Sequence, residues 1–139
     1  MAVLNLEIIT PSKSVFTGEI NSITVPGTLG SFQVLKNHAP LISTLEIGSI
    51  KVVDLQSKTI LYATGGGTIE VNDNKVLVLA DSIELIESID VQRARQSKER
   101  AEQRLVNKSV EKIDVARAEA SLARALNRIK LTEKHLTEK

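Results

Sequence analysis

The sequence has no cysteine or tryptophan, and its 139 residues include only two phenylalanines and one tyrosine. Without cysteine, the chain cannot form a disulfide framework, a thiolate metal site or a cysteine nucleophile. So few aromatic rings argue against a base-stacking platform for nucleic acid, which needs several exposed rings. Hydrophobic runs are also short. None approaches the roughly 20 residues that span a bilayer, so we expect no direct membrane insertion.

Histidine is scarce too, with two residues in the chain. With two histidines and no cysteine, the sequence predicts no metal site and no catalytic triad. The first residues, from Met1 to Glu7, lack the basic region and cleavage site of a secretory signal. We therefore expect a soluble, non-catalytic protein of a reducing compartment.

The net charge of +1 conceals an uneven distribution along the chain. Residues 1–87 hold five lysines, no arginine and nine acids, a net charge of −4, whereas residues 88–139 hold thirteen basic and eight acidic residues, a net charge of +5. All glycines and prolines lie in the first part, and all arginines lie in the second. This separation of turn formers from helix formers predicts two domains, 1–87 and 88–139.

The first part has the pattern of β-structure. Leu4, Leu6 and Ile8 alternate with polar residues, as in a strand with one buried face. Further short apolar segments follow, separated by frequent turn signals, which predicts an all-β sandwich or barrel.

The run from Gly65 to Gly67 resembles a phosphate-binding loop only superficially. Neither a Lys-Ser/Thr pair nor a helix start follows it. Because residues 68–71 continue as a strand, we interpret the glycines as a turn or bulge between two strands.

The second part is rich in helix formers and contains no glycine or proline from Asp90 onward. The hexapeptide 89–94 recurs in similar form at 113–118, and in each copy the aspartate suits a helix N-cap. This repeat predicts helices at about 91–107 and 115–134, joined near 108–112. The expected buried stripe on the second helix comprises Ala118, Leu122, Ala125, Leu126 and Ile129.

The basic residues of the second part alternate with acids, which is typical of a solvated or protein-facing helix surface. Arg124 and Arg128 nevertheless share a helix face and could clamp a phosphate or a carboxylate. A nucleotide, a membrane surface and an acidic protein helix remain alternative partners on this evidence.

Several motifs, in this order and spacing, resemble the epsilon subunit of F-type ATP synthases, whose mitochondrial counterpart is called delta. They are Ile9–Pro11, Val15–Ile20, Phe32–Ile42, Gly65–Val71, Val78–Asp81 and Ile89–Ala94. The resemblance covers the whole chain. It implies an α+β fold in which an N-terminal ten-stranded β-sandwich precedes a C-terminal antiparallel α-helical hairpin.

The resemblance also implies a role in the rotating central stalk, which couples proton flow to ATP synthesis. The sandwich would hold the gamma subunit and sit on the c-ring. The hairpin would either fold against the sandwich or extend into the alpha/beta catalytic head and inhibit ATP hydrolysis. No cofactor and no nucleic-acid partner are implied. The expected location is peripheral, on the cytoplasmic face of the inner (plasma) membrane or the stromal side of a plastid thylakoid.

Two segments would face the c-ring by this resemblance, namely the turn at Leu29, Gly30, Ser31 and Phe32 and the loop of Lys36, Asn37, His38, Ala39 and Pro40. The chain departs from the family at three places. Ser31 stands where an acid is common, Lys36 replaces the usual proline, and Gly67 takes the place of an aromatic residue.

Some bacterial members of the family bind ATP as a regulatory ligand that holds the hairpin down. The corresponding positions here are Glu84, Ile89, Asp90, Arg93, Ala94, Arg100, Arg124 and Arg128. The duplicate hexapeptide at 113–118 supports an alternative, in which the motif only starts a helix. A freestanding ATP-sensing module and, with less support, a nucleic-acid-binding hairpin are the other function classes.

Overall fold

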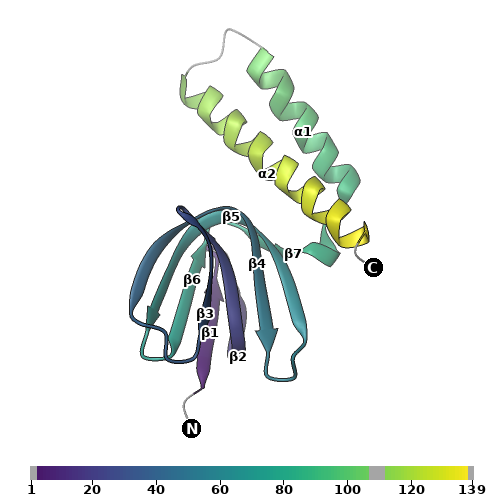
Figure 1. The fold of residues 1–139 in the computed structure, drawn as a ribbon. Coiled ribbons are helices and arrows are strands. Elements are labelled where there is room, and N and C mark those ends of the chain that lie inside the picture. Colours follow the sequence, from purple (N-terminus) through teal and green to yellow (C-terminus); the bar gives the residue numbers. More distant parts are fainter. Residues whose placement is uncertain (1–2, 107–111, 138–139) are drawn as a thin grey trace. The chain divides into compact units, whose positions relative to one another are not determined.

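The computed structural model describes residues 3–106 and 112–137 of the chain. It divides into two compact units, residues 1–85 and 86–139, which are described separately below. The first unit is a β-sandwich and the second is a pair of helices (Figure 1). This arrangement confirms the expected α+β fold class.

The sandwich contains seven strands among the described residues, rather than ten. They are β1 (Leu4–Ile9), β2 (Ser14–Gly27), β3 (Gly30–Leu35), β4 (Leu41–Asp54), β5 (Thr59–Asn72), β6 (Lys75–Ala80) and β7 (Ile83–Leu85). The lower number arises because β2, β4 and β5 each continue for 14 residues. Counting each of these long strands as two would restore the expected ten.

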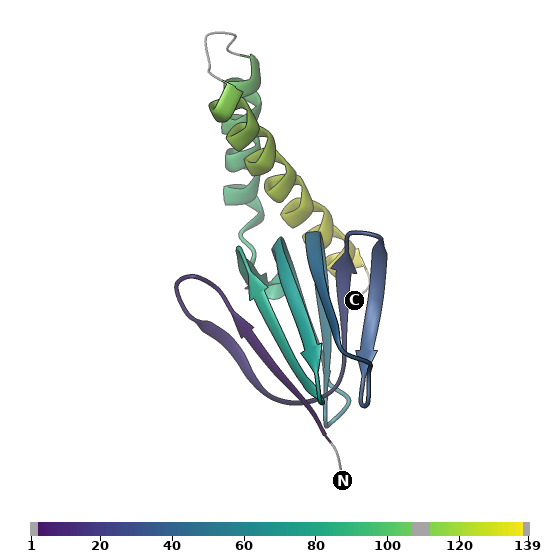
Figure 2. The same ribbon diagram turned by 90° about the vertical axis from the view of Figure 1, so that its left-hand side faces the viewer.

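The long strands join two layers because they change partners along their length. β2 pairs with β1 through its first half and with β3 through its second. β5 pairs with β7 near its start and with β6 near its end, while β4 lies against β5 throughout. The β1–β6 pairing is parallel and the others are antiparallel. Since β1 also pairs with β2, the sheet closes on itself, and Figure 2 shows the strands curving around a common interior.

The core of the sandwich is almost entirely aliphatic. On β1, Leu4, Leu6 and Ile8 are buried between exposed polar neighbours, as the alternation predicts. Burial of each large aliphatic side chain stabilises the fold by about 1.5–3 kcal/mol. Tyr62 is the buried aromatic residue of this core, and its burial raises the pKa of the phenol above 10.0. Beyond those of β1, the most completely buried side chains come from β2 to β6: Ile20, Ile23, Val25, Val34, Ile50, Val52, Ile69, Val71 and Val78.

The three glycines lie inside β5, so their interpretation as a boundary between two strands was wrong. Gly66 and Gly67 have φ values of 97° and 146°, which favour glycine and allow the strand to bend without ending. The bend is tied to the β6–β7 connection, because Gly65 N–H donates to Ser82 O and Asp81 N–H donates to Gly66 O, each at 2.9 Å.

The second unit begins with a short 3₁₀ helix, η1 (Ile86–Ser88), followed by α1 (Val91–Val106) and α2 (Lys112–Thr137). Asp90 caps α1, since its Oδ1 accepts the Arg93 N–H at 3.1 Å. The second predicted cap was wrong. α2 starts at Lys112, so the backbone is already helical at Asp114. The predicted connection at 108–112 falls mainly outside the described residues.

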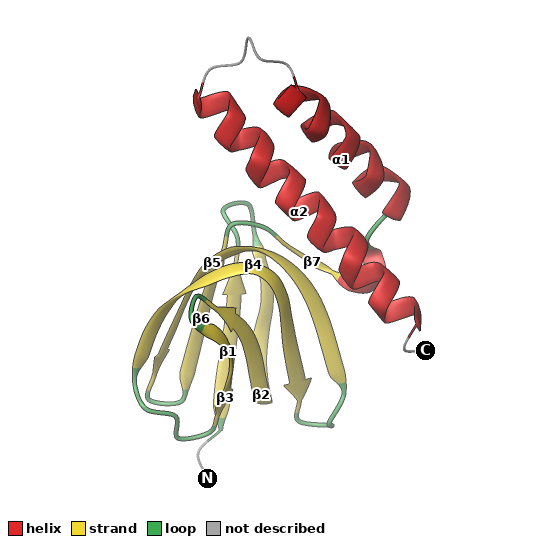
Figure 3. Ribbon diagram, turned by 45° about the horizontal axis from the view of Figure 1, so that its top comes forward, coloured by secondary structure: helices red, strands yellow, loops and turns green. Residues whose placement is uncertain are grey.

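Small side chains hold the two helices together. The buried positions are Ala94 and Ala101 on α1 and Ala118, Ala125 and Thr132 on α2, which recur every seven residues. Seven residues are about two helical turns, so these positions form one seam along each helix of the antiparallel pair (Figure 3). Leu126 was wrongly placed in the buried stripe, since it is 44% exposed.

Gly67 should be the least replaceable residue of the bend. A Cβ there would lie 2.1 Å from the carbonyl oxygen of Leu79 and 2.9 Å from Ala80 Cα, in a backbone conformation that already disfavours side chains. We expect Gly67→Ala to lower the free energy of unfolding by about 3 kcal/mol, measured by urea denaturation with Tyr62 fluorescence as the probe. Gly18→Ala is the matched control, because its Cβ would meet only the Phe16 ring at 3.6 Å. Equal stability of the two variants would contradict the assigned role of Gly67.

Candidate docking and nucleotide-binding residues

The turn between β2 and β3 presents one apolar side chain to solvent. Gly27 pairs with Gly30 and so closes a connection of two residues, Thr28 and Leu29. The Thr28 hydroxyl is hydrogen-bonded to the Thr44 hydroxyl and donates to Thr44 O at 3.3 Å, which ties the turn to β4. Leu29 is fully exposed at the tip. The exposed leucine side chain therefore lies on a tight turn that is anchored to β4.

The loop of residues 36–40 follows β3 directly. His38 N–H donates to Leu35 O at 3.2 Å, and Asn37 has a φ of 69°, so the chain turns sharply here. Lys36, Ala39 and Pro40 are exposed, while His38 is half-buried.

The two candidate c-ring segments lie at opposite ends of β3. That strand has six residues, which span about 20 Å at roughly 3.3 Å per residue. Gly30, Ser31 and Phe32 belong to the end near Leu29, with Ser31 exposed and Phe32 packed partly against the core. The structure thus separates the candidate surface into a turn and a loop instead of one cluster.

The candidate nucleotide-binding residues are divided between the two units. Glu84 lies on β7, paired with Ala63, whereas the remaining residues belong to the second unit. Within that unit Ile89, which precedes α1, and Ala94, in its first turn, are buried, and Asp90 accepts the Arg93 N–H. Helix capping by this motif is therefore observed directly.

Three arginines of the hairpin, Arg100, Arg124 and Arg128, lie near one level of the two helices. Arg95 and Glu133 form an ion pair across the hairpin at 3.8 Å. Arg100 lies five residues after Arg95 on α1, and Arg128 lies five residues before Glu133 on α2. Because the two helices are antiparallel, Arg100 and Arg128 lie at the same level of the hairpin. Arg124 is one turn, about 6 Å, further along α2.

Two of these guanidinium groups are hydrogen-bonded to a serine of their own helix. Arg100 donates to Ser97 Oγ at 3.2 Å and Arg124 donates to Ser121 Oγ at 3.3 Å. Both side chains are exposed. Such exposed guanidinium groups can bind phosphate or carboxylate oxygens. Arg93 lies about 10 Å from Arg100 along α1 and stands apart from this group.

Neither a metal centre nor a membrane-spanning helix emerges from the described part of the chain. No group of three or more metal-ligating side chains occurs in residues 3–106 and 112–137. Within the same residues, no helix is long and apolar enough to cross a membrane.

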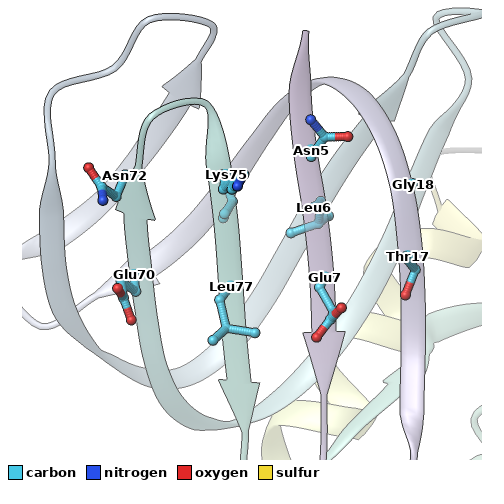
Figure 4. Close-up of a pocket in the computed structure, with 10 residues that line it drawn as sticks. Asn5, Leu6, Glu7, Thr17, Gly18, Glu70, Asn72, Lys75 and Leu77 are labelled. Atoms are coloured by element: carbon cyan, nitrogen blue, oxygen red, sulfur yellow. The ribbon is translucent and has the colours of Figure 1, made fainter.

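A groove on the outer surface of the sandwich was not found from the sequence. It crosses β5, β6, β1 and β2 and has a volume of about 450 Å³ (Figure 4). Glu70 and Glu7 flank Leu77 in one cross-strand row. The groove could not be recognised from the sequence, because it depends on the pairing of β1 with the distant β6. Its lining comprises Asn5, Leu6, Glu7, Thr17, Gly18, Glu70, Asn72, Lys75, Val76 and Leu77.

Comparison with known families decides the relationship. Residues 3–86 match the beta-sandwich domain of the ATP synthase delta/epsilon chain, and residues 87–133 match its long alpha-helix domain. The chain belongs to the ATP synthase delta/epsilon chain family. The resemblance noted in the sequence is thereby confirmed.

Members of the delta/epsilon family from bacteria are similar over nearly their whole length. The ATP synthase epsilon chain of Desulforamulus reducens is 45% identical over 128 residues, covering 92% of this chain and 96% of the relative. The epsilon chain of Nitratidesulfovibrio vulgaris strain DP4 is 48% identical, with coverages of 92% and 94%.

Solved structures of ATP synthases share the fold. A chain of the Euglena gracilis mitochondrial enzyme matches with a TM-score of 0.77 at 20% identity, covering 91% of this chain and 79% of that one. A chain of the Tetrahymena thermophila enzyme matches with a TM-score of 0.61 at 13% identity, covering 94% and 97%. At these identities the matches show the fold alone.

Gly67, which the resemblance in the sequence places where an aromatic residue is expected, has no space for a side chain in this structure. Its backbone leaves no room for a Cβ beside Leu79 O. A side chain at this position would therefore require a different path of β5.

Proposed function

We propose that the chain is an epsilon-type, non-catalytic subunit of the central stalk of a proton-translocating F-type ATP synthase. The observation that supports this most strongly is the match of both family domains, in order, over residues 3–133. The relatives covered almost end to end are ATP synthase epsilon chains. The similar solved chains come from assemblies described as F1/c-ring and central stalk/c-ring.

The sandwich, residues 1–87, acts in this proposal as the docking domain for the gamma subunit and the c-ring. The exposed Leu29 on its anchored turn and the exposed loop 36–40 are the surfaces offered to the c-ring. Because these surfaces lie at the two ends of β3, each contributes a separate contact. Such docking places the subunit at the membrane as a peripheral protein, on the cytoplasmic face of the plasma membrane or, in a plastid, the stromal side of the thylakoid.

The hairpin, residues 88–139, acts as a regulatory arm that inhibits ATP hydrolysis. Its seam of alanines buries little apolar surface, so the helices can separate at modest cost. Separation leaves the exposed arginines available for an acidic segment of the alpha/beta head. An electrostatic contact of this kind weakens as salt increases.

A comparison of the full chain with a variant that ends at Ser88 tests this proposal. Both proteins should co-purify with the gamma subunit, because the variant retains the closed sandwich and its core. Only the full chain should inhibit hydrolysis by a reconstituted catalytic head, and raised salt should reduce that inhibition. Equal inhibition by both proteins would contradict the regulatory role, and failure of the full chain to bind gamma would contradict the stalk assignment.

ATP as a regulatory ligand is a second proposal, favoured by the grouping of Arg100, Arg124 and Arg128 around one level of the hairpin. A triphosphate could be bound there by charge-assisted hydrogen bonds. A freestanding ATP sensor would share this site but would not bind gamma, so the co-purification above separates the two functions.

Calorimetry with the full chain and millimolar ATP tests the ligand. We expect measurable binding that Arg124→Ala weakens about tenfold, since a hydrogen bond to a charged group is lost. Arg117→Ala is the control, because Arg117 is exposed on the same helix but lies about 10 Å from Arg124. Absence of heat at millimolar ATP would leave helix capping as the role of the Asp90 motif, and equal losses in both variants would indicate non-specific charge attraction.

A further inference from the structure

Loop 36–40 is held in place by a residue 37 positions further along the chain. Asn37 N–H donates to Asn74 Oδ1 at 2.6 Å, and Asn74 Nδ2 donates to Asn37 Oδ1 at 3.2 Å. The side-chain amide of Asn74 is therefore hydrogen-bonded to both the backbone N–H and the side-chain oxygen of Asn37. Asn74 O also accepts the N–H of Asn5, which ties the same residue to β1.

Asn74 can make these contacts because of its place in a tight turn. Asn72 pairs with Lys75, which leaves Asp73 and Asn74 as the two residues between β5 and β6. Their φ values are 51° and 60°, the left-handed conformation that such two-residue hairpins require. Asparagine tolerates this conformation, so the turn keeps its geometry and still carries a side-chain amide.

Within the described residues, the other hydrogen bonds of the loop backbone and side chains are local. His38 N–H donates to Leu35 O, and His38 Nδ1 lies 2.6 Å from Ala39 O. Neither contact fixes the loop relative to the rest of the sandwich. The pair of asparagines therefore supplies the long-range link from the loop to the β5–β6 turn and to the first strand.

We propose that Asn74 is a positioning residue that preorganises loop 36–40 for docking. This inference rests on the proposed docking of the loop on the c-ring. A loop that is already ordered binds without the entropic cost of being fixed on contact, so its affinity is higher. Asn74 does not touch the partner in this proposal, and it acts entirely through Asn37.

Two glycine substitutions in the β5–β6 turn distinguish the positioning of the loop by Asn74 from an effect on the stability of the turn. Asn74→Gly deletes the side-chain amide but keeps a residue that adopts positive φ, so the hairpin and the Asn5 bond remain. Asp73→Gly makes the matching change at the neighbouring position and leaves the Asn37 contact intact. The first readout is amide hydrogen exchange at Asn37 in the full chain, which we expect Asn74→Gly to accelerate about tenfold or more and Asp73→Gly to leave unchanged.

The second readout is affinity for a detergent-solubilised c-ring that carries gamma. We expect Asn74→Gly to weaken binding about three- to tenfold through loss of preorganisation, while Asp73→Gly binds as the unmodified chain does. Unchanged exchange at Asn37, or unchanged affinity despite faster exchange, would overturn the positioning role. Ala39→Arg, which adds bulk at an exposed loop position, tests the docking itself. If it also leaves the affinity unchanged, the proposed docking of the loop fails, whereas a loss with Ala39→Arg alone overturns only the role of Asn74.

Discussion

The sandwich depends on three long strands, β2, β4 and β5, each of which passes from one layer to the other as one continuous strand. β5 shows the constraint most clearly, because its bend requires positive φ at Gly66 and Gly67 and brings Gly67 against the backbone of Leu79 and Ala80. The continuity of these strands allows the sheet to close, with β1 between β2 and β6. Closure in turn surrounds the aliphatic core and fixes the turns that carry Leu29 and Asn74.

The buried side chains of the hairpin, in contrast to those of the sandwich, are small. Its seam consists of alanines and one threonine at intervals of seven residues, and a buried methyl group contributes only about 0.8 kcal/mol, compared with about 1.5–3 kcal/mol for a valine or isoleucine. The Arg95–Glu133 pair is exposed on both sides and adds little. This difference agrees with the role proposed above, in which the sandwich stays attached while the weakly packed basic hairpin changes partners.

The features predicted correctly from the sequence depend on local pattern. The alternation at Leu4, Leu6 and Ile8 identified a buried strand face, and the Asp90 motif identified a capped helix start. Features that depend on contacts between distant segments of the chain were not predicted correctly. The bend at Gly66 looks like a strand boundary until the pairing of β5 is known, and Leu126 matches the helical stripe although the narrow alanine seam leaves it exposed. The Asn37–Asn74 pair and the groove beside β1 arise from residues that only the closed topology brings together.

The central claim is that the two units differ in stability because one is held by large aliphatic side chains and the other by methyl groups. Native-state amide hydrogen exchange on the full chain measures this difference directly. The account predicts that Ile23, Val52 and Ile69 exchange only through global unfolding of the sandwich, while Ala101 and Ala125 exchange at least about a hundredfold faster through opening of the hairpin. Equal protection of the two sets of amides, with one shared response to denaturant, would contradict it.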